Sequence, residues 1–245
     1  MSVDLLAVGD VMVDVVEGAS VEIRAGGSAV NAASAAVAAG RTALVVGCIG
    51  DDDLGLFVLD ELARRGVDAQ LTVIAGSPTG RVLVAGSGVV PERGANLAFS
   101  AEHLPAVAAR AVLVSGYQLL RDDSGPGTAA ALAAPGLVGV DLGSERRVRD
   151  YGVERSRELL ASVDVVFGNE AAVAALGALD GVLSVATLGA DGARAGDVWA
   201  RPPFVASGEL LGAGDVLAAT VLLGLADGLP VADALERGCA SACRA

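Results

Sequence analysis

Four residues near the end of the chain combine an open backbone with a carboxylate. Gly212, Ala213, Gly214 and Asp215 precede an almost wholly apolar run, 216–225, which predicts a glycine turn that leads into a buried helix. Backbone N–H groups and the positive dipole end at such a turn are suited to an anion, especially a phosphate. Asp215 could take a proton from an attacking hydroxyl there; the alternative is that it only caps its helix.

Two further polar residues lie near the N-terminus. Two apolar runs within residues 5–16 predict a buried first strand, with Asp14 at or beyond its end. The paired Gly26 and Gly27 would let the backbone approach a ligand, and the amide of Asn31 could bind hydroxyl groups. The alternatives are a solvated loop acid at position 14 and an ordinary glycine turn before a helix.

Unbroken apolar runs alternate with helical patterns along most of the chain. Predicted strands lie at 42–49, 111–115, 137–141, 163–167 and 183–187, and predicted helices end near 39 and 65 or cover 127–133, 153–160, 171–176 and 231–245. Continuous apolar strands indicate a parallel sheet covered on both faces, so the fold class is α/β. Ligands collect at the carboxyl ends of such strands, and the candidate loops are 9–14, 141–146, 168–170 and 187–192.

The segment 71–99 departs from this alternation. Short β-like runs at 71–74, 81–85 and 97–99 are broken by glycine and proline, which predicts a small sheet or flap inserted between α/β units. Three aspartates at 51–53 precede the second predicted helix. Helix capping is the preferred interpretation of these acids, and magnesium binding is the alternative.

Composition limits the kind of protein this is. The 245 residues, 53% of them hydrophobic, suit one large α/β domain, and the net charge of −13 disfavours a nucleic-acid binder. We find no apolar stretch long enough to span a membrane and no signal peptide, so we expect a cytoplasmic protein. Cys48, Cys239 and Cys243 lack a metal-binding spacing, which favours core packing.

Several segments together resemble the ribokinase-like, or PfkB-type, carbohydrate kinases. Residues 25–31 resemble that family's N-terminal glycine–asparagine signature, and residues 212–215 resemble its C-terminal one. The segments between them that also look like family landmarks are Gly50-Asp51-Asp52 with Gly55, Pro78-Thr79-Gly80, Asn169-Glu170 and 187–192. The resemblance covers nearly the whole chain, in the family's order.

The resemblance implies a three-layer α/β/α fold with a mostly parallel central sheet and a small β-sheet lid, formed by about 11–24 and 71–99. It also implies transfer of the γ-phosphoryl group of ATP, with Mg²⁺, to a hydroxyl of a small sugar or sugar-like substrate. Asp215 would be the general base, and the N–H groups of Gly212, Ala213 and Gly214 would form the anion hole. Asp14, Gly26, Gly27 and Asn31 would bind the sugar, and Asn169, Thr187, Gly189 and Gly192 would lie along the nucleotide phosphates.

Three features depart from the family pattern. The family's Asp-Thr pair is replaced by Glu209 and Leu210, with Leu211 next, which weakens the expectation of phosphate-binding hydroxyls and of a monovalent-cation site. The family's Asn-x-x-Glu pattern would start at Asn169, but position 172 is alanine. The last predicted helix, 231–245, ends without the stretch that usually walls the adenine pocket. A more open nucleotide site, a shortened chain and a compact branch of the family would each explain this, and we expect weak ATP binding.

Two other functional classes compete with the kinase. A dinucleotide-dependent oxidoreductase also uses a glycine turn, but here Leu217 stands where the third glycine is needed. A non-catalytic sugar- or nucleoside-binding relative is consistent with the three departures, whereas Asp215 favours an active enzyme. No Arg or Lys cluster marks a sugar phosphate, although Arg24, Arg81 and Arg93 could lie near the lid, and aromatic residues make up only 3%. We therefore expect a free sugar as substrate and a homodimer through exposed lid strands.

Overall fold

The computed structural model describes residues 2–17, 20–85, 88–204 and 211–244. Its strands are β1 (Ser2–Val8), β2 (Met12–Glu17), β3 (Val21–Gly26), β4 (Ala43–Gly50), β5 (Asp68–Ile74), β6 (Gly80–Ala85), β7 (Gly88–Glu92), β8 (Ala108–Ser115), β9 (Leu137–Asp141), β10 (Val165–Asn169), β11 (Leu183–Thr187), β12 (Ala193–Ala195) and β13 (Val198–Ala200). Its α-helices are α1 (Ser28–Ala38), α2 (Asp53–Arg64), α3 (Gly116–Leu119), α4 (Gly125–Ala129), α5 (Glu145–Tyr151), α6 (Val153–Leu160), α7 (Glu170–Leu176), α8 (Ala213–Ala226) and α9 (Val231–Ala242).

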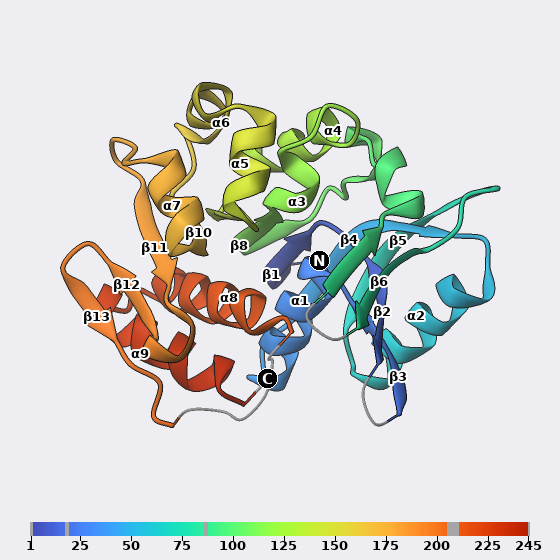
Figure 1. The fold of residues 1–245 in the computed structure, drawn as a ribbon, viewed down its shortest axis with the longest axis horizontal. Coiled ribbons are helices and arrows are strands. Elements are labelled where there is room, and N and C mark those ends of the chain that lie inside the picture. The colour runs from blue at the N-terminus through green and yellow to red at the C-terminus, as the bar shows by residue number, and fades with distance from the viewer. Residues whose placement is uncertain (1, 18–19, 86–87, 205–210, 245) are drawn as a thin grey trace.

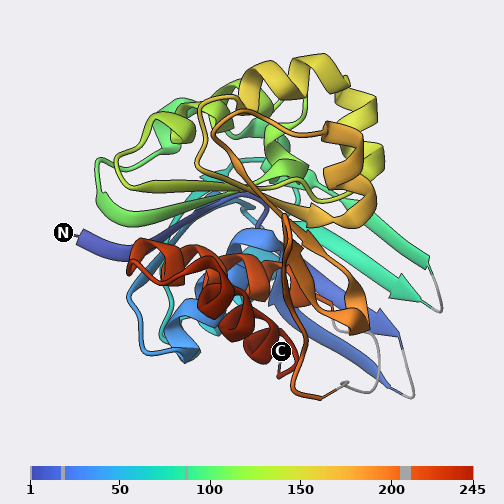
Figure 2. The same ribbon diagram turned by 90° about the vertical axis from the view of Figure 1, so that its left-hand side faces the viewer.

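The large sheet has the strand order β13-β12-β11-β10-β9-β8-β1-β4-β5 (Figure 1). The pairings from β11 to β5 are parallel, and the short β12 and β13 add an antiparallel edge. One buried cluster joins the sheet to α1, α2, α8 and α9, and a second joins its other face to α3–α7. The sheet lies between these two helix layers in Figure 2. The expected three-layer α/β/α fold is therefore confirmed.

A smaller sheet with the order β3-β2-β6-β7 lies beside this domain. Its two inner strands, β2 and β6, run parallel, and both outer strands are antiparallel to their neighbours. The chain enters it directly from β1 through a three-residue crossover that begins at Gly9. A Cβ atom at Gly9 would lie 2.5 Å from Cβ of Ser115, so only glycine fits this crossing over the end of β8.

Buried polar contacts fasten the small sheet to the large one. Asp52 caps α2 by accepting from the N–H of Gly55 at 3.0 Å, and it also accepts from the N–H of Thr79 at 2.9 Å. The Thr79 hydroxyl in turn accepts from Gly50 N–H at 2.9 Å, which ties the start of β6 to the end of β4. The capping interpretation of this acidic segment is thus confirmed for Asp52.

Three sequence-based assignments in this region are wrong. Residues 11–16 do not continue the first strand, because the chain leaves β1 at Val8 and Asp14 lies inside β2 of the small sheet. Residues 71–74 belong to β5, the edge of the large sheet, where exposed alternating side chains imitate a lid strand. Residues 97–99 are not a strand, since a 3₁₀ helix, η1 (Gly94–Ala98), begins at a glycine with φ of 51°.

Candidate active site

A cleft of ≈ 530 Å³ lies between the small sheet and the N-terminal ends of α1 and α8. Six of the predicted residues line it: Asp14, Gly27, Asn31, Gly212, Gly214 and Asp215. They come from β2, from α1 and the glycine before it, and from α8 and the glycine before it. The fold therefore brings the two glycine signatures, far apart in the sequence, to one cleft.

Asp215 lies in the first turn of α8, and the side-chain amide of Asn31 donates a 2.9 Å hydrogen bond to its Oδ2. Burial is the main cause that raises the pKa of Asp215 to about 7, and repulsion from Asp141 adds to it. Hydrogen bonds from Asn31 and Ser28 act in the opposite direction. A carboxylate with a pKa near neutrality is well matched to accepting a proton from a hydroxyl.

The backbone before Asp215 is open to a ligand on one side and closed on the other. Gly212, the N-cap of α8, has a left-handed conformation with φ of 90°, and a Cβ there would lie 2.6 Å from Nδ2 of Asn31. A Cβ atom added at Gly214 would have no neighbouring atom of the rest of the protein within 4 Å. No side chain in the described part of the chain caps this helix. The N–H groups at the start of α8 can therefore face an anion.

Asp14 is 2% exposed, and its Oδ2 lacks a hydrogen-bond partner among the described residues. Arg24 forms an ion pair with that oxygen at 3.5 Å, but burial outweighs it and raises the pKa of Asp14. A Cβ at Gly26 would lie 2.2 Å from the same oxygen, and a Cβ at Gly27 would lie 2.3 Å from the carbonyl oxygen of Asp10. The space beside both glycines is thus occupied by protein atoms, and Asp14 Oδ2 lies between Gly26 and Arg24.

The structure adds cleft residues that received no role from the sequence: Asp10, Arg93, Tyr117, Asp141 and Arg146. Asp10, Asp141 and Arg146 fall within two loops that the strand-end rule singled out, so that rule was the available signal. Arg93 follows β7, where the sequence has no periodic pattern. The sequence showed no arginine or lysine cluster near the substrate residues and allowed Arg93 a place near the lid; the structure puts both Arg93 and Arg146 in the cleft wall.

Asp141 ends β9 and accepts from the N–H of Gly143 at 3.0 Å. Burial raises the pKa of Asp141 as well. A cavity of ≈ 10 Å³, the size of a single water site, is lined by Asp141 and Asp215 together with Ser28 and Ser115. The Ser115 hydroxyl is buried and has no hydrogen-bond partner among the described residues. Two carboxylates whose charges disfavour each other therefore meet beneath the cleft.

The four residues predicted to contact the nucleotide gather at neighbouring strand ends outside this cleft. Asn169 ends β10 opposite Thr187, the last residue of β11, and its Oδ1 caps α7 by accepting from Ala172 N–H at 2.8 Å. Gly189 and Gly192 lie in the turn after β11, both with positive φ. Ala172 is fully buried, so the position of the family's glutamate is packed against the core here.

The altered segment before the glycine turn is only partly described. Glu209 and Leu210 lie outside the described residues, and Leu211 is the first residue after the gap. The carbonyl of Leu211 accepts from Arg24 Nη2 at 3.4 Å. Among the described residues, no helix is long and apolar enough to cross a membrane, and no group of three or more His, Cys, Asp or Glu side chains is arranged to hold a metal ion.

A three-layer α/β/α domain with a small lid sheet and a glycine turn before α8 is the ribokinase-like arrangement. A family model described as pfkB family carbohydrate kinase matches residues 2–245. The chain belongs to the pfkB family of carbohydrate kinases. The resemblance of the two glycine signatures to that family is thereby confirmed.

Known relatives fall in the same family. Over 162 residues the chain is 33% identical to the ATP-dependent ribose-1-phosphate kinase of Halopiger xanaduensis (strain DSM 18323 / JCM 14033 / SH-6). That match covers 62% of this chain and 52% of the relative, about half its length.

Solved structures share the fold at lower identity. The adenosine kinase from Sinorhizobium meliloti has a TM-score of 0.84 and 22% identity, covering 99% of this chain and 93% of that one. A putative Ribokinase II from E. coli in complex with ATP and Mg²⁺ has a TM-score of 0.81 and 17% identity, covering 96% and 89%.

The raised pKa of Asp215 predicts a pH-dependent gain in stability for Asp215→Asn. The carboxyl has a pKa of 3.8 when unfolded and about 7 when folded, so its contribution is favourable below pH 3.8 and lost as the pH rises through 7. We expect the variant to exceed the wild type by about 1–3 kcal/mol at pH 8 and to match it near pH 4. Urea unfolding at both pH values measures this. Asp68→Asn, an exposed acid on β5, is the control, and equal stabilities of wild type and Asp215→Asn at pH 8 would contradict the pKa assignment.

Proposed function

We propose that this chain is an ATP-dependent kinase that transfers the γ-phosphoryl group to a hydroxyl of a small sugar or sugar-like substrate. The observation that carries the proposal is the carboxylate of Asp215, with its raised pKa, directly beside the uncapped start of α8 in a lid-covered cleft. Membership of the pfkB family supports it, as does the printed name of the relative from Halopiger xanaduensis.

Phosphoryl transfer needs an aligned hydroxyl and stabilised charge, with little covalent chemistry from the protein. The Asp215 carboxylate takes the proton of the substrate hydroxyl, and Asn31 fixes the orientation of that carboxylate. The N–H groups of Gly212, Ala213 and Gly214 stabilise negative charge on the transferred group, because the helix dipole adds to their hydrogen bonds. Asp14 and Asp10, which line the cleft beside Arg24 and Arg93, accept hydroxyl groups of the sugar.

ATP would bind along the backbone near Asn169, Thr187, Gly189 and Gly192, where the carboxyl ends of β10 and β11 lie side by side. When bound, ATP supplies the phosphoryl group. The described residues offer no all-protein cage for Mg²⁺. Because Mg²⁺ usually binds through substrate phosphates and water, we expect it to arrive with ATP. The relative solved with ATP and Mg²⁺ supports this choice of cofactors.

Asp215→Asn tests the role of the base. Since general-base catalysis contributes roughly 10²–10⁴-fold, we expect turnover to fall by about that factor while the protein stays folded. ADP release with Mg²⁺ and ATP, measured across sugars, sugar phosphates, sugar acids and nucleosides, gives both the rates and the substrate class. If no compound is turned over by the wild type but one raises its Tm, the chain is a binding protein and the kinase proposal is wrong.

Asp141→Asn tests the pairing of the two acids. Removing a like charge lowers the pKa of Asp215, so we expect the rising limb of the kcat/KM–pH profile to move by roughly one unit toward lower pH. Asp68→Asn lies at the opposite end of the sheet and should leave the profile in place. A rate loss in Asp141→Asn without any movement of the profile would show that Asp141 does not act on the base.

The lid sheet also supports a homodimer. Its edge strands β3 and β7 each pair with a single neighbouring strand among the described residues. They carry Val21, Ile23, Val89 and Val90, all more than half exposed. Edge pairing with a second copy would cover both features. Light scattering on the purified protein should give twice the 24.1 kDa mass, and a monomer at tens of micromolar would contradict the proposal.

A further inference from the structure

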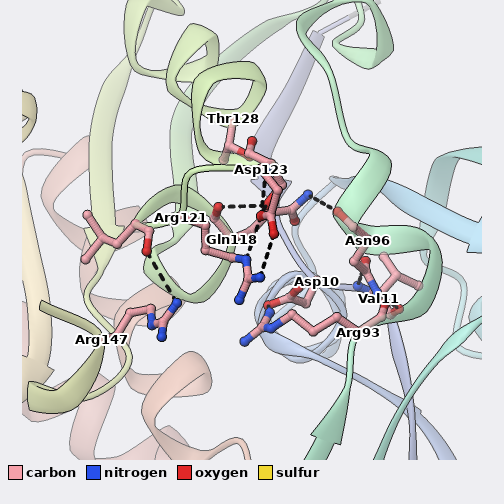
Figure 3. Close-up of polar contacts among 11 residues, drawn as sticks. Asp10, Val11, Arg93, Asn96, Gln118, Arg121, Asp123, Thr128 and Arg147 are labelled. Carbon is pink, nitrogen blue, oxygen red and sulfur yellow. Dashed lines mark hydrogen bonds and ion pairs between the residues drawn. The ribbon is translucent and has the colours of Figure 1, made fainter. Parts of the chain in front are cut away.

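Four arginines gather at one wall of the cleft, on elements that are distant in sequence. Arg93 follows β7 of the lid, Arg121 follows α3, and Arg146 and Arg147 lie in α5. In Figure 3 the guanidinium groups of Arg93, Arg121 and Arg147 turn toward one another. Arg93 and Arg146 line the cleft itself. Two of the four arginines therefore line the cleft, and Arg93, Arg121 and Arg146 all lie close enough to Arg147 to repel its charge.

The carboxylates around these arginines do not neutralise them fully. Arg93 pairs with Asp10, and Arg121 holds Asp123 through two bonds of 2.7 Å. Arg146 and Arg147 share the single carboxylate of Asp150, at 3.3 and 3.4 Å. Four guanidinium groups thus face three carboxylates, which leaves a local excess of one positive charge in a chain of net charge −13.

Partial burial and mutual repulsion make the positive charge of these arginines unfavourable. The side chains of Arg93, Arg121 and Arg147 are only 14%, 23% and 22% exposed. Burial lowers the pKa of Arg147, and repulsion from Arg121 and Arg93 lowers it further. Partly buried like charges that repel one another are stabilised when an anion joins them. Three carboxylates already pair with the four guanidinium groups, so Arg146 and Arg147 must share one of them.

The part of the cleft around Asp215 has the reverse character. Asp14 and Asn31 line it beside Asp215, and the buried Asp14 Oδ2 has no hydrogen-bond partner among the described residues, although Arg24 lies 3.5 Å away. These groups suit neutral hydroxyls, because a second anion there would meet carboxylates. A ligand that fills the cleft therefore needs hydroxyl groups at one end and negative charge at the other.

We propose that the acceptor sugar carries an anionic group, a phosphate or a carboxylate, bound by Arg93 and Arg146 in the field of Arg121 and Arg147. This rests on the proposed kinase function and replaces the expectation of a free sugar. Asn96 holds Arg93 in place by donating to the Arg93 carbonyl and to the Val11 carbonyl, both at 2.9 Å. Because Arg93 follows β7 of the lid and Arg146 belongs to α5, a bound anion would also link the lid to the large domain.

The test compares four forms of one pentose: ribose, ribose 1-phosphate, ribose 5-phosphate and ribonate. With Mg²⁺ and ATP, we expect kcat/KM of the wild type to be at least 100-fold higher for one anionic form than for ribose. Arg146→Gln and Arg93→Gln should raise KM for that form at least tenfold with little change in kcat. The phosphates and ribonate distinguish a phosphate from a carboxylate, and the two phosphates indicate which end of the sugar the arginines bind.

Arg149→Gln is the matched control, since Arg149 lies on the same helix, is 62% exposed and pairs with Glu145. It should leave every KM unchanged. Arg146 is 88% exposed, so Arg146→Gln should fold even if loss of the buried Arg93–Asp10 pair unfolds Arg93→Gln.

The outcomes separate this proposal from the kinase function. Turnover of ribose, another neutral sugar or a nucleoside as efficient as that of the best anionic form would overturn the anion subsite and leave the kinase intact. A KM for the anionic form that Arg146→Gln leaves unchanged would overturn it too. If nothing is turned over, a rise in Tm with an anionic pentose that Arg146→Gln abolishes would support the subsite while the kinase proposal fails; no rise in Tm contradicts both.

Discussion

The cleft depends on one hydrogen bond, 2.9 Å long, from the Asn31 amide to the Asp215 carboxylate, which lie 184 residues apart. It joins the N-terminal ends of α1 and α8, and the two helices must approach so closely that position 212 has no room for a side chain. Their packing on the sheet permits this approach. The middle of α8 is apolar on all sides because it is enclosed by α1, α9, β8 and β9. The core thus sets the geometry of the polar end.

The cleft contains buried acidic and basic side chains whose charged forms are less stable in the folded chain than in water. Burial raises the pKa of Asp14, Asp141 and Asp215 together, so all three carboxylates resist ionisation in the folded chain. Among the arginines, burial and repulsion from Arg121 and Arg93 lower the pKa of Arg147, so its charged form is disfavoured as well. Both clusters lie on the same cleft, whereas the two apolar clusters lie on the faces of the sheet away from it. The hydrophobic core therefore stabilises a fold whose least stable contacts are those at the cleft.

The large domain could be predicted from the sequence because its strands are continuous apolar runs, and such runs belong to a sheet covered on both faces. The predicted strand 163–167 starts two residues before β10. Residue 163 still closes the turn after α6 by donating to the carbonyl of Leu160, and the strand begins at Val165. The lid was harder, since its strands are half exposed and pair across long separations, so no local pattern distinguishes them from β5.

The candidate site, like the fold, could be predicted from the sequence only in part. Glycines beside a carboxylate or an amide are visible in sequence because each signature is local, and six of those residues meet in the cleft. Asp141 and Arg146 could be assigned to a candidate loop but not to a role. The sequence could place Arg93 near the lid but not in the cleft wall, because that position follows from the lid register and from the bonds of Asn96.

The topology of the lid limits how this protein can be divided or recombined. Its sheet is built from two hairpins, β2–β3 and β6–β7, joined where Met12 lies opposite Gly80, and the intervening chain forms α1, β4, α2 and β5 of the large domain. An isolated two-stranded hairpin is marginal in water, so neither half is an independent module. A lid with a different selectivity could not be transplanted as one cassette; both hairpins and the Asp52–Thr79 fastening would have to be exchanged together.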